Sequence, residues 1–159
     1  MGRHVEEARM NPVMKATMKA GSSLMVSLYK ASGGRIGGRV KGLQVILLTV
    51  PGRRTGRPHT TAVSCFEHAG GYVVAGSAGG MPREPQWFKN LRKAPAAEVQ
   101  LGRRRFRAAV RELLGTERDE VWRDVVVARA PFFADYSTKG HRTIPLALLT
   151  PLPEPGLGA

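Results

Sequence analysis

The spacing of apolar residues changes along this chain, from a helical period before residue 32 to strand-like runs after residue 43. Seven residues of the segment 11–30 recur at spacings of three and four: Val13, Met14, Thr17, Met18, Gly21, Met25 and Leu28. This spacing predicts an amphipathic helix whose methionine-rich face packs on a core or lies on an anionic membrane. The glycine-dense residues 32–42 then break the helix and form a linker.

Short strand patterns fill most of the remaining chain. The predicted strands cover residues 44–50, 59–66, 72–77, 97–101, 105–113 and 144–149. Gly70 and Gly71 favour a hairpin between the second and third of these strands, and Gly102 favours another between the fourth and fifth. Most of the strands therefore pair with a neighbour in the sequence, in antiparallel order.

Two internal helices are expected between the strands. Residues 86–93 place apolar side chains at helical spacing, and Pro95 prevents much continuation. Thr116 and Asp119 resemble a capping box that opens a second helix, which Pro131 ends. Residues 130–136 are then a loop.

Six short, mostly antiparallel strands with helices packed outside them indicate an α+β, mainly β fold, namely a small β-barrel. We expect an N-terminal helix and linker over 1–42, a barrel domain over 43–152 and a flexible tail over 153–159.

Cysteine and apolar content restrict the cellular setting. Cys65 is the only cysteine of the 159 residues, so neither an intramolecular disulfide nor a Cys/His zinc cluster is expected, and no metal site is predicted. Charged residues interrupt the N-terminus where a signal peptide needs an apolar stretch, and the apolar runs are too short to span a bilayer. These features predict a cytoplasmic protein, with peripheral membrane contact open through the N-terminal helix.

The net charge of +13 attracts nucleic acid, anionic lipid and anionic small molecules alike, or reflects an arginine-rich composition. Arg103, Arg104 and Arg105 beside Phe106 motivate a nucleic-acid-binding module as a rival interpretation. The sequence shows no recognition helix or zinc knuckle, which disfavours this rival.

Three segments carry candidate chemistry. The turn Gly52 to Arg57 combines glycines with arginines, which bind phosphate or carboxylate oxygens, although basic turns are commonly only solvated. Residues 76–80 form a glycine-rich loop that can approach a flat ring or a phosphate. Trp87 and Asn90 place a ring and an amide on one side of the short helix 86–93.

In order, the motifs GRRTGRPHTT, YVVAGSAGG, PQWFKNL and FADY ahead of RTIPLALL resemble the deazaflavin-dependent nitroreductase family. The resemblance runs from about Leu24 to Pro151. It implies a split β-barrel in which the deazaflavin coenzyme F420 lies in a cationic groove. FMN and FAD are less expected as cofactors.

The resemblance also implies a set of cofactor-binding residues. The phosphate and glutamate tail of F420 would be held by Arg53, Arg54 and Thr55. The deazaflavin ring would be lined by the strand residues His59, Thr60, Thr61, Ala62, Val63 and Ser64. The loop residues Ala75, Gly76, Ser77 and Ala78 would pass under the cofactor. The helix side would be closed by Gln86, Trp87, Phe88, Lys89 and Asn90.

A reduced deazaflavin transfers a hydride, so the protein's task is to bind, orient and exclude water. The acceptor would lie between the N-terminal helix and the loop 131–136, against the substrate-binding residues Phe132 and Phe133, with Tyr136 as the catalytic proton donor. The best-known branch of the family has several tyrosines in this segment, whereas Tyr136 is alone here. We therefore expect quinones or other conjugated acceptors to be preferred over nitro compounds.

His59, Ala62 and Val63 depart from the usual family pattern, which predicts weakened cofactor binding. A non-catalytic flavin, haem or deazaflavin carrier on the same barrel stays open as an alternative. An oligomer is also open.

Overall fold

The computed structural model describes residues 23–154. Residues 23–32 are helical, as predicted for this part of the N-terminal segment. The rest of the predicted helix, with Met14 and Met18, and residues 155–159 of the predicted tail lie outside the described residues.

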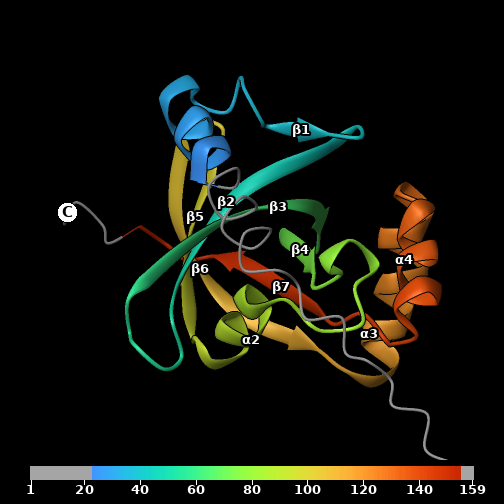
Figure 1. The fold of residues 1–159 in the computed structure, drawn as a ribbon. Helices are drawn as coiled ribbons and strands as arrows, with labels where there is room; N and C mark the ends of the chain where they lie inside the picture. The colour runs from blue at the N-terminus through green and yellow to red at the C-terminus, as the bar shows by residue number, and fades with distance from the viewer. Residues whose placement is uncertain (1–22, 155–159) are drawn as a thin grey trace, which may run out of the picture.

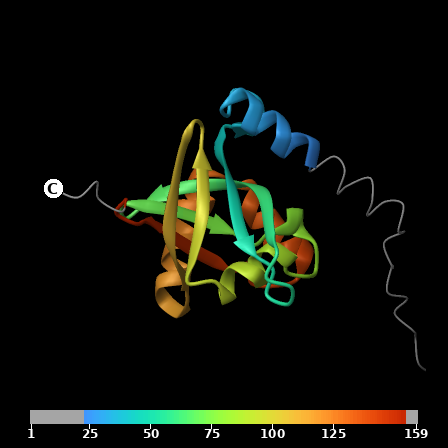
Figure 2. The ribbon, with the colours of Figure 1, turned by 90° about the vertical axis from the view of Figure 1, so that its left-hand side faces the viewer.

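Six antiparallel strands form a closed barrel (Figures 1 and 2). They are β2 (Leu43–Pro51), β3 (Pro58–His68), β4 (Gly71–Ala75), β5 (Ala96–Leu101), β6 (Arg104–Leu113) and β7 (Leu146–Pro151). Their order is β2-β3-β4-β7-β6-β5, and β5 pairs back onto β2. The two-residue β1 (Arg39–Val40) extends the β2 edge from within the predicted linker. The predicted fold class is confirmed.

Alternation along β2 shows why these sequences form a barrel. Ile46, Leu48 and Val50 point into the barrel core, where all three are almost fully buried. Val45 and Leu47 point outward, and the 23–32 helix covers them. A strand with both faces covered is continuously apolar, as residues 45–48 are.

Besides the 23–32 helix on β2, helices cover the barrel in two further places. Helix α2 (Gln86–Lys93) packs Phe88 and Leu91 into the barrel core. Helix α3 (Gly115–Val121), a π-helical segment (Trp122–Val127) and α4 (Phe132–Gly140) form a second core with the outer faces of β3, β4 and β7. A single 3-10 turn, η1 (Ala78–Gly80), follows β4.

Three sequence predictions for the residues after 113 differ from the structure. Residues 132–136 belong to α4 and not to a loop, because Pro131 stands at the N-cap, where a fixed φ favours the start of a helix. Thr116 is not a capping residue: Leu114 occupies the N-cap of α3 without a side-chain hydrogen bond. The last strand begins at Leu146, two residues later than predicted.

The hydroxyl of Tyr29 joins the 23–32 helix to the seam where β2 meets β5. It lies 2.9 Å from the carbonyl oxygen of Val45 and 3.2 Å from that of Gln100, and it accepts a hydrogen bond from the Gly102 amide at 2.8 Å. Tyr29 is 1% exposed. The helix is therefore fixed to the outside of the barrel where β2 meets β5. Among the residues described, no helix has the length and apolar character needed to cross a bilayer.

Candidate functional site

A cleft of about 730 Å³ lies between the start of the 23–32 helix, the turn after β2, the first residues of β3 and helix α2. Its walls are formed by Ser23, Val26, Ser27, Gly52, Arg53, Arg54, Thr55, Pro58, His59, Thr60, Thr61, Gln86, Trp87 and Asn90. The structure thus brings together the turn after β2, the start of β3 and helix α2, whereas the predicted site residues 75–78 do not line this cleft.

Arg53 is held in a fixed position in this cleft by two side-chain amides. Its guanidinium donates to Oδ1 of Asn90 and to Oε1 of Gln86, both at 2.8 Å, and its backbone amide also donates to Asn90 Oδ1 at 3.2 Å. Asn90 is only 8% exposed. Because both acceptors are neutral, they orient the guanidinium without neutralising its charge. The result is a preorganised positive charge for an anionic ligand.

The turn that carries Arg53 is tightly built. The amide of Gly52 donates to the Arg57 carbonyl at 2.7 Å, and the Gly56 amide donates to the Gly52 carbonyl at 2.8 Å. A Cβ added to Gly52 would lie 2.9 Å from Thr55 Oγ1 and 3.0 Å from His59 Nε2. Glycine at 52 therefore allows His59 to approach the turn, while Arg54 projects as an exposed side chain.

At the start of β3, His59, Thr60 and Thr61 all line the cleft, and beyond them the pleat decides which residues face outward. Thr60, Ala62 and Ser64 lie on the outer face, opposite Thr49, Leu47 and Val45 of β2. Val63 points into the barrel core and is 9% exposed, so it supports the strand and does not line the cleft. The hydroxyls of Thr60 and Thr49 lie 2.7 Å apart.

Helix α2 contributes both to the cleft and to the core. Trp87 lines the cleft and packs edge-on against Phe88, with ring centroids 5.5 Å apart. Phe88, which the sequence placed in the cofactor site, is fully buried in the barrel core. A Cβ on Gly76 would come within 3.0 Å of the Phe88 ring and of Pro145. Phe88 therefore supports the loop after β4 from inside.

Arg142 holds that loop in place, and sequence reasoning missed it. Its Nε donates to the Met81 carbonyl at 3.0 Å. Its Nη2 lies 2.9, 3.1 and 3.3 Å from the carbonyl oxygens of Gly76, Ser77 and Arg83. Burial lowers the pKa of this guanidinium, and its buried Nη1 has no partner among the described residues. In the sequence, the one hint of a role for Arg142 was its place at the start of the motif RTIPLALL.

The predicted acceptor residues lie on α4, outside the 730 Å³ cleft. Phe133 is 6% exposed and packs edge-on against Phe66, with ring centroids 5.6 Å apart, so it is a core residue and not a surface for substrate. Phe132 and Tyr136 are half-buried, with their rings 5.7 Å apart. Gly80 of η1 lies directly beneath Tyr136, because an added Cβ would be 3.4 Å from its ring.

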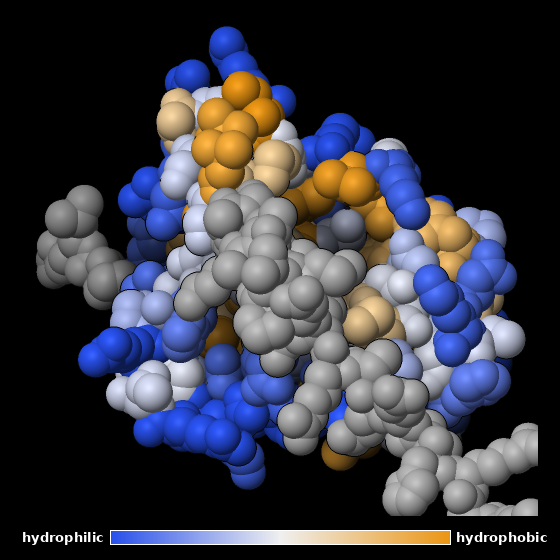
Figure 3. All heavy atoms as spheres, viewed as in Figure 1, coloured by the Kyte–Doolittle hydropathy of each residue, from blue (hydrophilic) through white to orange (hydrophobic). Residues whose placement is uncertain are grey.

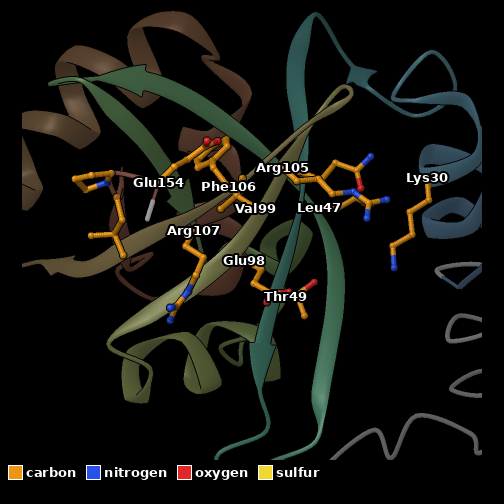
Figure 4. A pocket seen from close by; sticks show the side chains of 12 residues that line it. Lys30, Leu47, Thr49, Glu98, Val99, Arg105, Phe106, Arg107 and Glu154 are labelled. Atoms are coloured by element: carbon orange, nitrogen blue, oxygen red, sulfur yellow. The ribbon is translucent and has the colours of Figure 1, made fainter. Parts of the chain in front are cut away.

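A second groove, of about 660 Å³, runs over the outside of β2, β5 and β6 (Figure 4). Thr49, Glu98 and Arg107 lie along it on the outer faces of these strands, and Lys30 and Glu154 stand at its two ends. Nothing in the sequence pattern indicated this groove. Over the described residues, no group of histidine, cysteine and acidic side chains is placed to hold a metal ion. Burial raises the pKa of the Cys65 thiol to about 12, which makes it a poor nucleophile.

The fold and the cleft together define a class: a six-stranded β-barrel with a cationic cleft beside its outer face, a combination suited to a flat, anionic cofactor. Residues 21–151 match the family model described as F420H(2)-dependent quinone reductase, and the chain belongs to this family. Membership confirms the predicted class, an oxidoreductase that uses coenzyme F420.

Similar proteins agree with this assignment. An F420H(2)-dependent quinone reductase of Mycobacterium tuberculosis is 31% identical over 127 residues, which cover 78% of this chain and 85% of that protein. The solved structure of an F420-H2 dependent reductase, FDR-A, is 32% identical and superposes with a TM-score of 0.59 over 66% of this chain and 92% of its own. The haem storage protein HutZ of Vibrio cholerae has a TM-score of 0.50 over 69% of this chain and 82% of its own, but is 15% identical, so it shares the fold alone.

Proposed function

We propose that this protein binds reduced F420 in the 730 Å³ cleft and transfers its hydride to a quinone. The observation that carries the proposal is Arg53, a cation held by neutral amides at the wall of a cleft, in a chain of the F420H(2)-dependent quinone reductase family. The donor set suits the phosphate and carboxylates of F420, since arginine forks bind both.

Each wall of the cleft has a separate task in this proposal. Arg53 and Arg54 bind the anionic tail, and Thr60 lines the cleft beside the flat ring. Ala62 and Ser64 lie farther along the same outer face of β3 and offer small side chains to the ring. We assign Gly76 and Ser77, on the loop whose carbonyls Arg142 holds, to the part of the ring beyond the cleft. F420, when bound, supplies a hydride from a ring carbon. The 23–32 helix covers the outer face of β2 and excludes water from that side.

The acceptor lies, in this proposal, beside α4. Phe132 offers a partly exposed ring and Tyr136 a hydroxyl that can donate a proton to a reduced oxygen. Phe133 has no such role because its ring is in the core. In a Phe133→Tyr variant the new hydroxyl would be buried. The effect of an additional phenol near the acceptor is therefore tested with Phe132→Tyr.

Substrate preference tests this assignment. With reduced F420, we expect steady reduction of 1,4-naphthoquinone. Reduction of bicyclic nitroimidazoles should be slower by about 100-fold, because Tyr136 is the single tyrosine where the best-known branch of the family has several. The measurement is the F420 absorbance during turnover with each acceptor, and the Phe132→Tyr variant should gain more nitro activity than quinone activity. Equal rates for both acceptors in the parent protein would show that this interpretation of α4 is wrong.

A titration separates the enzyme from a carrier of another cofactor. Fluorescence titrations with F420, FMN and haem should give tight binding for F420 alone. Tight binding of FMN or haem, without F420-dependent turnover, would favour a non-catalytic carrier.

We also propose a peripheral contact with an anionic membrane, which is where apolar quinones reside. Leu24, Met25, Ile36 and Val40 are all exposed, with Leu24 at 60%. Apolar surface gathers at the top of the molecule, over the 23–32 helix and the segment leading to β1, with hydrophilic side chains around it (Figure 3). Apolar side chains bordered by cations are typical of a surface that inserts between lipid headgroups.

Vesicle binding tests the membrane contact. Leu24→Glu together with Ile36→Glu should reduce co-sedimentation with vesicles of phosphatidylglycerol and phosphatidylcholine by about tenfold, because two apolar insertions are lost and two like charges face the lipid. Leu114→Glu changes an equally apolar residue, 69% exposed, outside this surface and serves as the control. Equal sedimentation of the parent protein, the double variant and the Leu114→Glu control would contradict the proposed membrane contact.

A further inference from the structure

Lys41 reaches from the β1–β2 hairpin to α4. Its Nζ donates a hydrogen bond to the hydroxyl of Tyr136 at 3.2 Å, although the two residues are 95 positions apart. The same Nζ lies 4.7 Å from the centre of the Phe132 ring and 5.8 Å from that of Tyr136. A cation over an aromatic face is attracted by the ring quadrupole, so both contacts favour this position of the ammonium group.

The hairpin backbone holds Lys41 in an unusual conformation. Val40 pairs with Leu43, which leaves Lys41 and Gly42 as the two turn residues, with φ values of 50° and 79°. Two positive φ angles define a type I′ turn, whose first position usually holds asparagine, aspartate or glycine. A lysine there is disfavoured, and an uncommon residue in a strained backbone is a reason to look for a role.

The hydrogen bond has a direction that matters for chemistry. An ammonium group can only donate, so the Tyr136 oxygen is the acceptor and its own proton points elsewhere. Gly80 lies beneath the Tyr136 ring, and Gly140 allows α4 to approach η1, because a Cβ there would lie 3.0 Å from the Met81 carbonyl. Tyr136 is therefore fixed between the loop after β4 and Lys41.

We propose that Lys41 is part of the acceptor site, where its ammonium group binds the oxygen of a quinone and orients Tyr136 as the proton donor. This role rests on the proposed function. Lysine keeps donors beyond the one given to Tyr136, and the exposed ammonium group can offer them to a ligand against Phe132.

The reaction balances with these groups. A quinone takes up two electrons and one proton as a hydride from reduced F420, which becomes oxidised, and one of its oxygens gains a negative charge. The ammonium group of Lys41 stabilises this oxyanion, and the Tyr136 hydroxyl gives it a proton. The product is a hydroquinone, and the tyrosine regains its proton from water.

A binding experiment tests Lys41 without turnover. The probe is 2-hydroxy-1,4-naphthoquinone, an anion at neutral pH, compared with neutral 1,4-naphthoquinone by calorimetry on the full chain without F420. Lys41→Met should weaken binding of the anion by about tenfold, since a charge-assisted contact is lost at a partly exposed site. Lys41→Arg should restore most of it, and binding of the neutral quinone should stay within about twofold throughout, because it presents no full charge.

Lys139→Met is the matched control, because it also removes one lysine charge, at a position on α4 about one turn beyond Tyr136. It should leave binding of the anion within about twofold. An equal loss in Lys139→Met and Lys41→Met would mean that only the general positive field acts, and it would overturn the proposal. Unchanged binding in Lys41→Met would overturn it as well.

Kinetics separate this role from the proposed function. In the full enzyme, Lys41→Met should lower kcat for quinone by about tenfold and leave the KM for F420 unchanged. In a Tyr136→Phe background the same change should have a smaller effect, since the two residues act together. If the parent protein shows no F420-dependent turnover, the proposed function fails while the anion-binding test still decides on Lys41. Turnover with a fully active Lys41→Met variant removes the Lys41 proposal alone.

Discussion

Replacing Arg53 with glutamine is expected to weaken the binding of F420 by about 100-fold, since one fixed charge-assisted contact contributes about 1.5–3 kcal/mol. The effect is large because Asn90 and Gln86 already hold the guanidinium in place, so little side-chain entropy is lost when an anion binds. Arg54→Ala should weaken F420 binding by about tenfold, since that side chain is exposed and solvent screens its charge. Fluorescence titration of F420 measures both.

The control for Arg53 lies in the same turn. Arg57 is exposed and does not line the cleft, so Arg57→Ala removes an equal charge and should change affinity by about twofold or less. Asn90→Ala should cause a loss of F420 affinity between those of Arg53→Gln and Arg57→Ala, because Arg53 keeps its charge but loses the side chain that holds it. Equal losses in Arg53→Gln and Arg57→Ala would show that the turn acts only through its net charge.

Replacing Arg142 with methionine is expected to destabilise the protein by about 3 kcal/mol, because four backbone carbonyls lose one charged donor group. For a chain of this size the loss lowers Tm by about 10 °C. Hydrogen exchange of residues 76–83 should accelerate more than that of the barrel strands, since the loop opens first.

Arg129→Met provides the comparison, because Arg129 donates to a single carbonyl, that of Glu67 at 2.7 Å, from an exposed position. It should cost about 0.5–1 kcal/mol. Urea denaturation of both variants measures the difference. Similar, small losses in the two would mean that the Arg142 contacts contribute nothing to the stability of the loop.

Local patterns were sufficient for the barrel but not for the positions of all helical side chains. The hairpin between β3 and β4 and the buried run of β2 are encoded within a few residues, and both form as predicted, although the turn residues are Ala69 and Gly70 and not Gly70 and Gly71. Pro131 is ambiguous in sequence, because proline both ends a helix and begins one. Reading it only as an end made α4 a loop and placed Phe133 at the surface, whereas adjacent helical residues point in different directions.

Contacts in the candidate site were also beyond prediction from local sequence patterns. Arg53, Gln86 and Asn90 were each singled out as ligands of a cofactor, yet their mutual contacts link residues 33 and 37 positions apart and could not be read from spacing. Arg142 lies alone in an ordinary loop, and only the folded chain shows the carbonyls around it. The 660 Å³ groove combines residues of β2, β5 and β6, and the pattern of no single strand distinguishes a groove from an ordinary barrel surface.

The position of β7 has a consequence for synthesis of the chain on the ribosome. β7 is the last strand to be made, yet it lies between β4 and β6 (Figure 1). Until residues 146–151 emerge, β4 and β6 each have an unpaired edge, and the apolar faces of both strands lack their neighbour. Closure of the barrel therefore waits until residues 146–151 have been made, and the nascent chain must be protected from aggregation until then.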